Sequence, residues 1–323
     1  MQTEIVSADS KTVIERVVEL LQAGEVVALP TETVYGLAAD AFNPVAVAKI
    51  FETKERPRFD PLIVHLPNRE ALHDVATADT QLVAGLIDRF WPGPLTVILP
   101  KRKRIPDIVT AGLGTVAVRM SANAVFAEIA ARLARPLAAP SANRFGHISP
   151  TAASHVLDEL GGRIPLIVDG GSAQHGLEST IVRIIDDQIE ILRRGPITAE
   201  MLQEFAPISE SISGNAIVAP GQLQSHYAPR TKLILVNALE DFSVPFGKRI
   251  GALHFASAVK TGQFSITRRL SERADLREAA ANLFGMLREL DTQNLDLIVA
   301  ELLPEDGLGA AINERLRRAA SPR

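Results

Sequence analysis

The spacing of apolar residues along the first two-thirds of the chain predicts short buried strands separated by amphipathic helices. Apolar runs predict strands over residues 25–29, 62–66, 95–99, 115–120, 137–139 and 164–168. Helical spacing predicts helices over 13–21, capped by Asp9 and stopped at Gly24, from Asn43-Pro44 to about Lys54, and over 79–90. Two further runs, 181–185 and 189–192, flank Asp186-Asp187 and predict a hairpin. These elements predict an α/β domain with a mixed, twisted sheet.

The character of the chain changes after Phe205. Residues 207–229 are rich in serine, glycine and proline and show little periodicity, which is typical of a functional or disordered linker. Beyond them, the pattern predicts strands over 233–236, 249–254 and 295–300 and helices over 274–290 and 310–318. We therefore expect a catalytic domain at 1–205, a linker or lid at 206–230, and a small α/β domain at 231–323.

Composition narrows the class of protein. Apolar residues make up 46% of the chain and the formal net charge is −4, so the chain is globular and carries no overall basic bias for nucleic acid. The basic run at 101–104 is typical of a solvated loop. The chain has no cysteine, which excludes disulfides and thiolate chemistry. With no apolar signal core and no apolar stretch near ~20 residues, we expect a soluble, cytoplasmic protein away from membranes.

The first candidate site segment is Pro-Thr-Glu-Thr-Val-Tyr-Gly at residues 30–36, directly after the first predicted buried strand. Ligands of α/β sheets bind beyond the carboxyl ends of strands, so these hydroxyl groups could face a small polar ligand. The alternative is a turn in which the threonines bond their own backbone.

The second segment, residues 54–61, places Lys54, Arg56 and Arg58 at the end of a predicted helix, before the strand that ends at His65. Arginine and lysine on a loop held by prolines suit a polyphosphate. The alternatives are favourable placement of cations at a helix C-terminus and, for His65, an ordinary structural role.

Two further segments carry glycines and small polar residues. The third, at 111–115, leads into a strand with Arg119 near its end, which either emerges to solvent or, if buried, meets an anion such as a carboxylate. The fourth contains Ser141 and Asn143, and Ser149 before Pro150 is also a normal helix cap. The chain has no Walker loop, dinucleotide-binding glycine motif or Gly-x-Ser-x-Gly elbow, and its histidines lack metal-ligand spacing.

These segments, in this order, closely resemble the threonylcarbamoyl-AMP synthase family, also called YrdC-like. The resemblance is carried by Pro-Thr-Glu-Thr-Val-Tyr-Gly-Leu at 30–37, Lys-x-Arg-Pro at 54–57 with Pro-Leu-Ile-Val-His at 61–65, and Ser-x-Asn at 141–143. It covers about residues 5–205. Pro-Gly at 220–221 and Ser-His-Tyr-Ala-Pro at 225–229 resemble the linker of longer, two-domain members, which implies a smaller Rossmann-like C-terminal domain.

The resemblance implies that the chain condenses L-threonine, bicarbonate or CO2, and ATP into threonylcarbamoyl-AMP and pyrophosphate. Other proteins, a downstream threonylcarbamoyl transferase machinery, then modify an adenosine of tRNA, with at most a transient contact between tRNA and this chain. The resemblance implies that ATP is held by Lys54, Arg56, Asp60, Thr115, Ser141, Asn143, Ser149, Arg193 and Tyr227. It implies that L-threonine is held by Thr33, His65, Arg119, Ala139 and Ser179, with Arg119 pairing the carboxylate.

The expected cofactor is Mg2+, held mainly by the ATP phosphates, and no side chain is assigned as a general acid or base. We further expect the linker to form a lid, with Tyr227 reaching into the site. Two other functions fit parts of the sequence: a module that binds double-stranded RNA or tRNA without catalysis, and a carbamoyl transferase of a protein maturation pathway. The absence of acylphosphatase-like and zinc-finger segments argues against the second.

Overall fold

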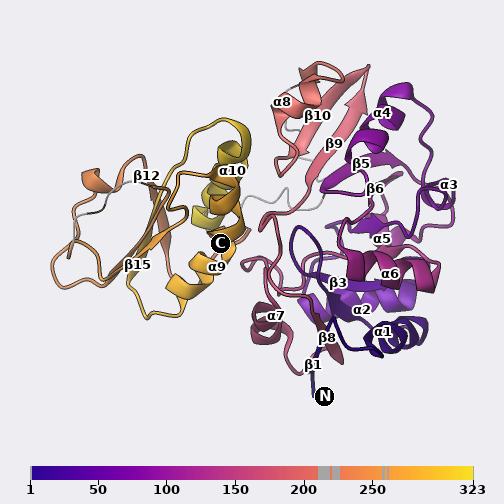
Figure 1. The fold of residues 1–323 in the computed structure, drawn as a ribbon, viewed down its shortest axis with the longest axis horizontal. Helices are drawn as coiled ribbons and strands as arrows, with labels where there is room; N and C mark the ends of the chain where they lie inside the picture. Colours follow the sequence, from indigo (N-terminus) through magenta and orange to yellow (C-terminus); the bar gives the residue numbers. More distant parts are fainter. Residues whose placement is uncertain (1, 210–218, 220–225, 257–258, 260–261, 323) are drawn as a thin grey trace. The chain divides into compact units, whose positions relative to one another are not determined.

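The computed structural model describes residues 2–209, 219, 226–256, 259 and 262–322, and in it the chain forms two compact units. Unit 1 comprises residues 1–145, 150–174 and 178–222, and unit 2 comprises residues 146–149, 175–177 and 223–323. Figure 1 shows a large sheet with helices in unit 1 and a smaller sheet with α9 and α10 in unit 2. Most of the expected linker, residues 210–218 and 220–225, lies outside the described residues.

Unit 1 is built on a mixed sheet of eleven strands, in the order β1-β8-β2-β3-β7-β4-β6-β5-β9-β10-β11. The predicted α/β class with a mixed sheet is therefore confirmed. Its strands are β1 Glu4–Ser7, β2 Val27–Leu29, β3 Gly36–Asp40, β4 Ile63–His65, β5 Leu95–Pro100, β6 Thr115–Arg119, β7 Leu137–Ala138, β8 Leu166–Asp169, β9 Thr180–Ile185, β10 Gln188–Arg193 and β11 Ile208–Ser209. Its helices are α1 Val13–Gln22, α2 Pro44–Lys54, α3 Leu72–Val75, α4 Gln81–Phe90, α5 Asp107–Thr110, α6 Ala124–Leu133, α7 Ala153–Leu160 and α8 Ala199–Gln203.

Local capping explains where several helices begin. The Asn43 side chain accepts hydrogen bonds from the amides of Val45 and Ala46 at the start of α2, as predicted. Two expected caps are wrong. The residue before α1 is Thr12 rather than Asp9, and the residue before α7 is Ala152 rather than Ser149.

Strand alternation gives the sheet two different faces. In β2, Ala28 packs into the main core, while Val27 and Leu29 pack on the opposite face into a second core. Helices α1 and α6 cover that second core through residues such as Val17 and Phe126. Farther along the sheet, the same alternation creates a small cluster on strands β4, β5, β6, β9 and β10. Its described members are Ile63, Ile98, Ala117, Ile181, Leu192 and Ala219, and none of these residues lies on a helix.

Unit 2 is a small α/β unit with a parallel sheet in the order β12-β15-β13-β14. Its elements are β12 Leu233–Val236, the 3-10 helix η1 Leu239–Asp241, β13 Ile250–His254, β14 Ile266–Arg269, α9 Leu276–Asp291, β15 Leu297–Glu301 and α10 Gly307–Ala320. This parallel sheet with its helices is the smaller C-terminal α/β arrangement that the resemblance implied. Among the described residues, no helix has the length and apolar character needed to cross a bilayer.

Candidate active site

The candidate site residues lie largely on one face of the large sheet. In β6, Val118 packs into the main core, whereas Ala117 belongs to the small cluster on the other face. Arg119 follows Ala117 by two positions, so it shares that face. The same alternation places His65 of β4 with Ile63 of the cluster. Strand alternation therefore places His65 and Arg119 on the face of the sheet that carries the small cluster.

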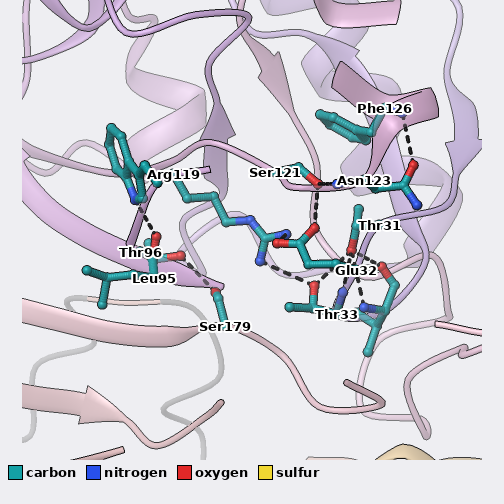
Figure 2. Close-up of polar contacts among 12 residues, drawn as sticks. Thr31, Glu32, Thr33, Leu95, Thr96, Arg119, Ser121, Asn123, Phe126 and Ser179 are labelled. Carbon is teal, nitrogen blue, oxygen red and sulfur yellow. Dashed lines mark hydrogen bonds and ion pairs between the residues drawn. The ribbon is translucent and has the colours of Figure 1, made fainter. Parts of the chain in front are cut away.

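Arg119 lies at the centre of a buried polar cluster. Its Nη2 lies 2.9 Å from Oε1 of Glu32, and its Nη1 donates a 3.2 Å hydrogen bond to Oγ1 of Thr33. Ser121 donates a hydrogen bond to the second carboxylate oxygen of Glu32. Figure 2 shows the Arg119 side chain directed toward Glu32 and Thr33. Among the described residues, Nε of Arg119 has no hydrogen-bond partner, so an N–H group is left for a ligand.

His65 lies beside Arg119, with which it pairs across β4 and β6. Burial, reinforced by the positive charge of Arg119, holds the pKa of His65 well below its ordinary value of 6.5, although a main-chain hydrogen bond with Ala139 acts the other way. The ring contacts Phe126 of α6 at 4.8 Å between centroids. His65 is therefore a neutral, buried imidazole, suited to a hydrogen bond rather than to a charge pair.

A second polar network joins β10 to β5 on the same face through Ser179, which directly precedes β9. Arg193, at the end of β10, donates 3.0 Å hydrogen bonds to the carbonyl oxygen and to Oγ of Ser179. Ser179 also shares a 2.7 Å hydrogen bond with Thr96 of β5, and Thr96 is fully buried. Ser179 is thus held from two sides, with its hydroxyl oriented by both neighbours.

Lys54 ends α2 inside the protein instead of in solvent. Its ammonium group donates to the carbonyl oxygens of Ser141, at 2.5 Å, and Asn143. Burial is the main reason why the pKa of Lys54 lies well below its ordinary value, and the charge of Arg56 adds to it. This lysine therefore joins the segment at 54–61 to the segment at 139–143, as a shared ligand site requires.

Three cations surround one buried carboxylate. Nη2 of Arg56 lies 2.9 Å from Oδ2 of Asp60, and both side chains are buried. Burial raises the pKa of Asp60, while the charges of Arg56, Lys54 and Arg193 oppose that rise. Three positive groups against one carboxylate leave an excess of positive charge, which a polyanion such as a triphosphate would balance.

The remaining predicted nucleotide residues are Thr115, Ser149 and Tyr227. Thr115 begins β6, paired with Pro100 at the opposite end of the strand from Arg119, and its side chain makes no hydrogen bond with another described residue. Ser149 and Tyr227 belong to unit 2. The Tyr227 ring stacks on Phe284 at 5.4 Å, and the Arg315 guanidinium lies 5.2 Å from the ring centroid.

The segment at 30–36 combines both readings that its sequence allowed. Thr31 bonds its own backbone, because its Oγ1 donates to the carbonyl of Val34 and accepts from the amides of Thr33 and Val34. Tyr35 donates a 2.6 Å hydrogen bond to the carbonyl of Gly171, and burial raises its pKa to about 12. These two residues shape the segment and leave the adjacent Glu32 and Thr33 for the cluster around Arg119.

Glu32, Ser121 and Thr96 are the members of these networks that sequence reasoning did not assign. Glu32 lies in the first candidate segment, and its carboxylate is the kind of anion that a buried Arg119 would need. Thr96 is a polar residue at an inward position of an apolar strand. Ser121 offers no comparable signal, since a serine after a strand is common in turns.

Comparisons with known proteins decide the family. A family model described as "Telomere recombination" matches residues 19–195, and one described as "Threonylcarbamoyl-AMP synthase, C-terminal domain" matches residues 197–321. A threonylcarbamoyl-AMP synthase of Bacillus subtilis is 40% identical over 320 residues, covering 94% of this chain and 92% of the relative. The chain belongs to the threonylcarbamoyl-AMP synthase family.

Further relatives agree. A threonylcarbamoyl-AMP synthase of Pyrococcus abyssi is 37% identical, covering 94% of this chain and 92% of the relative. The crystal structure of P. abyssi Sua5 complexed with L-threonine has a TM-score of 0.91 at 36% identity and covers 99% of this chain and 98% of that one. The predicted family, fold class and enzyme activity are thereby confirmed: the protein is a threonylcarbamoyl-AMP synthase with a YrdC-type domain and a Sua5 C-terminal domain.

Proposed function

We propose that this threonylcarbamoyl-AMP synthase holds L-threonine at Arg119 and ATP at Lys54, Arg56 and Arg193 on one sheet face. The threonine amine captures CO2 or bicarbonate, and an oxygen of the resulting carbamate attacks the α-phosphorus of ATP. Pyrophosphate leaves with the electron pair of the broken P–O bond. Other proteins then transfer the threonylcarbamoyl group to an adenosine of tRNA.

The observation that carries the proposal is the direct contact between Arg193 and Ser179. The first is a proposed ATP residue and the second a proposed threonine residue. Because the product joins threonine to the α-phosphate, the two substrate sites must meet, and this contact is where they would do so. The P. abyssi relative was solved in complex with L-threonine, which supports L-threonine as a substrate of this chain.

On the threonine side, the substrate carboxylate would pair with the Arg119 guanidinium, whose Nε lacks a partner within the described residues. Thr33 and Ser179 would present hydroxyls, neutral His65 would offer a ring nitrogen, and the main chain of Ala139 would add a polar group. A fork of guanidinium N–H groups fits a carboxylate better than a lysine would.

On the nucleotide side, the excess positive charge around Asp60 would stabilise the triphosphate and the charge that develops as pyrophosphate leaves. Among the described residues, no group of three or more His, Asp or Glu side chains is placed to hold a metal ion. Mg2+ would take its ligands mainly from the ATP phosphates, where it would neutralise phosphate charge. Ser141, Asn143, Thr115, Ser149 and Tyr227 complete the proposed nucleotide set.

RNA contact belongs to this proposal only as a transient step. Within the basic run at 101–104, Lys101 bonds to Asp107, and Arg104 lies 2.9 Å from Asp74 and stacks 4.1 Å from the Phe42 centroid. Acidic side chains thus pair with two of the four cations of the run, which reduces the charge that it offers to phosphates.

The test is pyrophosphate release by the purified protein with ATP, Mg2+ and bicarbonate, with and without L-threonine. We expect release to depend on L-threonine and to fall at least tenfold, about 1.4 kcal/mol, in Arg119→Lys, which keeps the charge but loses the fork. Release that ignores L-threonine would overturn the proposed reaction.

A further inference from the structure

The Arg119 cluster contains an acid whose part in the reaction is unassigned. Glu32 is 5% exposed and Arg119 is 2% exposed, so the pair is screened from water. A guanidinium buried this deeply needs a counter-charge inside the protein, because an uncompensated charge is costly in a low-dielectric interior. Glu32 supplies that counter-charge, but its geometry does more than neutralise.

The two carboxylate oxygens of Glu32 have different partners. Oε1 accepts a hydrogen bond from Nη2 of Arg119, and Oε2 accepts one from the buried Ser121 hydroxyl. Ser121 also accepts a 3.3 Å hydrogen bond from the amide of Asn123. Because Asn123 caps α6 by accepting from the amide of Phe126, the carboxylate is anchored to the beginning of a helix.

The guanidinium is therefore fixed on both terminal nitrogens, by Glu32 on Nη2 and by Thr33 on Nη1. Thr33 is in turn held 2.8 Å from Thr31, the residue that shapes the turn. Five N–H groups belong to an arginine, and these contacts use two of them, so the plane of the fork is set while other N–H groups stay available.

We propose that Glu32, braced by Ser121, is a positioning residue that fixes the plane of the Arg119 guanidinium for the carboxylate of L-threonine. The proposal rests on the proposed function, in which Arg119 takes that carboxylate. It assigns Glu32 no contact with ATP and no proton transfer. Glu32 pre-organises the N–H groups of the Arg119 guanidinium, so loss of Glu32 should lower the affinity for L-threonine.

The experiment measures binding of L-threonine and of L-threoninol, which lacks the carboxylate, to the full-length protein by calorimetry. In Glu32→Ala we expect L-threonine affinity to fall about tenfold or more, with L-threoninol and ATP affinities within about twofold. Glu32→Gln keeps an oxygen for Arg119 and a polar group for Ser121, so it should recover affinity to within about threefold of the wild type. The matched control is Glu190→Ala, which removes another buried acid, 6% exposed and bonded at 2.8 Å to Arg183, and should leave L-threonine binding unchanged.

Ser121→Ala keeps the proposal testable if Glu32→Ala does not fold. It should weaken L-threonine about threefold to fivefold without changing ATP affinity, and an unchanged affinity would overturn the proposal. Equal losses in Glu32→Ala and Glu32→Gln would also overturn it, because charge and not position would then be what Glu32 supplies. If the wild type fails to prefer L-threonine over L-threoninol, or Arg119→Lys keeps that preference, the proposed function itself fails. If the wild type shows the preference and Glu32→Ala retains it in full, only this inference is refuted.

Discussion

The ammonium group of Lys54 lies 2.5 Å from the carbonyl oxygen of Ser141, a residue 87 positions farther along the chain. The same ammonium group donates to the carbonyl of Asn143, and the amide of Phe145 donates back to the carbonyl of Lys54 at 2.9 Å. Two of the loop segments singled out in the sequence are thus joined by one buried cation. An incoming phosphate would compete with carbonyl oxygens for this ammonium group, so the loop and the nucleotide are linked through it.

Replacing Lys54 with methionine should lower kcat/KM for ATP on the order of 100-fold, because a pre-organised charged donor to the triphosphate is lost. Pyrophosphate release at varied ATP would measure this. The control is Lys49→Met on the same helix, since Lys49 forms a partly exposed ion pair with Glu25. Comparable losses in both variants would contradict a specific role for Lys54.

ATP binding should be accompanied by proton uptake. The pKa of Lys54 lies well below its ordinary 10.5 in the ligand-free protein, because burial disfavours the charged form. Bound phosphate favours the ammonium form, and therefore ATP affinity should fall as pH rises through the folded-state pKa. Calorimetry in two buffers with different ionisation enthalpies measures the protons taken up. Lys54→Arg should abolish the uptake, because arginine stays charged in both states.

The stability of the ligand-free protein should also depend on pH through Lys54. Below 10.5 the unfolded chain holds a proton on Lys54 that the folded chain disfavours, so the contribution of Lys54 to stability should fall as pH drops from 10.5 toward the folded-state pKa. Denaturant unfolding of wild type and Lys54→Met at several pH values would isolate the contribution of Lys54. It would appear as a difference in how steeply the free energy of unfolding changes with pH. Parallel pH profiles for the two proteins would contradict the depressed pKa.

Tyr35 should matter for stability and little for catalysis. Its hydroxyl donates to the carbonyl of Gly171 at 2.6 Å and accepts from the amide of Gly170 at 3.1 Å. Tyr35→Phe should therefore lower the free energy of unfolding by about 1–2 kcal/mol, while threonine-dependent turnover stays within about twofold. A large rise in KM for L-threonine would show that the tyrosine contacts substrate.

Thr96→Val should raise KM for L-threonine about fivefold, which corresponds to about 1 kcal/mol, because Ser179 loses one of the two neighbours that orient its hydroxyl. The control is Thr110→Val: Thr110 is equally buried, and its hydroxyl bonds to the carbonyl of Leu113 at 3.0 Å. Identical kinetics for wild type and Thr96→Val would show that Ser179 is oriented by Arg193 alone.

Tyr227 carries two separable expectations. Tyr227→Ala should destabilise unit 2 by about 3 kcal/mol, since a buried ring that packs on Phe284 is removed. Tyr227→Phe keeps the ring and removes the hydroxyl, so a fall in kcat/KM for ATP in that variant would support the proposed nucleotide contact. Unchanged ATP kinetics in Tyr227→Phe would count against it.

Helices and strands marked by turn residues or by a regular apolar pattern could be predicted from the sequence, and those without such marks could not. The hairpin between β9 and β10 was predicted from Asp186-Asp187, and both residues adopt positive φ, 48° and 57°. In contrast, β3 was missed because its residues are mostly small and all buried, so the strand shows no alternation. The edge strand β1 was missed because most of its residues are exposed.

The candidate site shows the same division. From its place in an apolar strand, Arg119 was expected either to reach solvent or to meet an anion, and the sequence did not identify Glu32 as its partner. Which loops meet depends on strand order, and β2 is separated from β6 by three strands in the sheet. Such neighbours arise from the fold as a whole, and residue spacing along the chain does not encode them locally.

The alternation that separates Val118 from Ala117 and Arg119 has a consequence for how this chain can vary. Successive side chains of a strand point to opposite faces of the sheet. Inserting or deleting one residue within β4 or β6 would therefore move the side chains beyond that point to the other face. His65 and Arg119 would then enter the apolar core, and valines would face the substrates. The residue count of these two short strands is therefore constrained by both the apolar core and the candidate site.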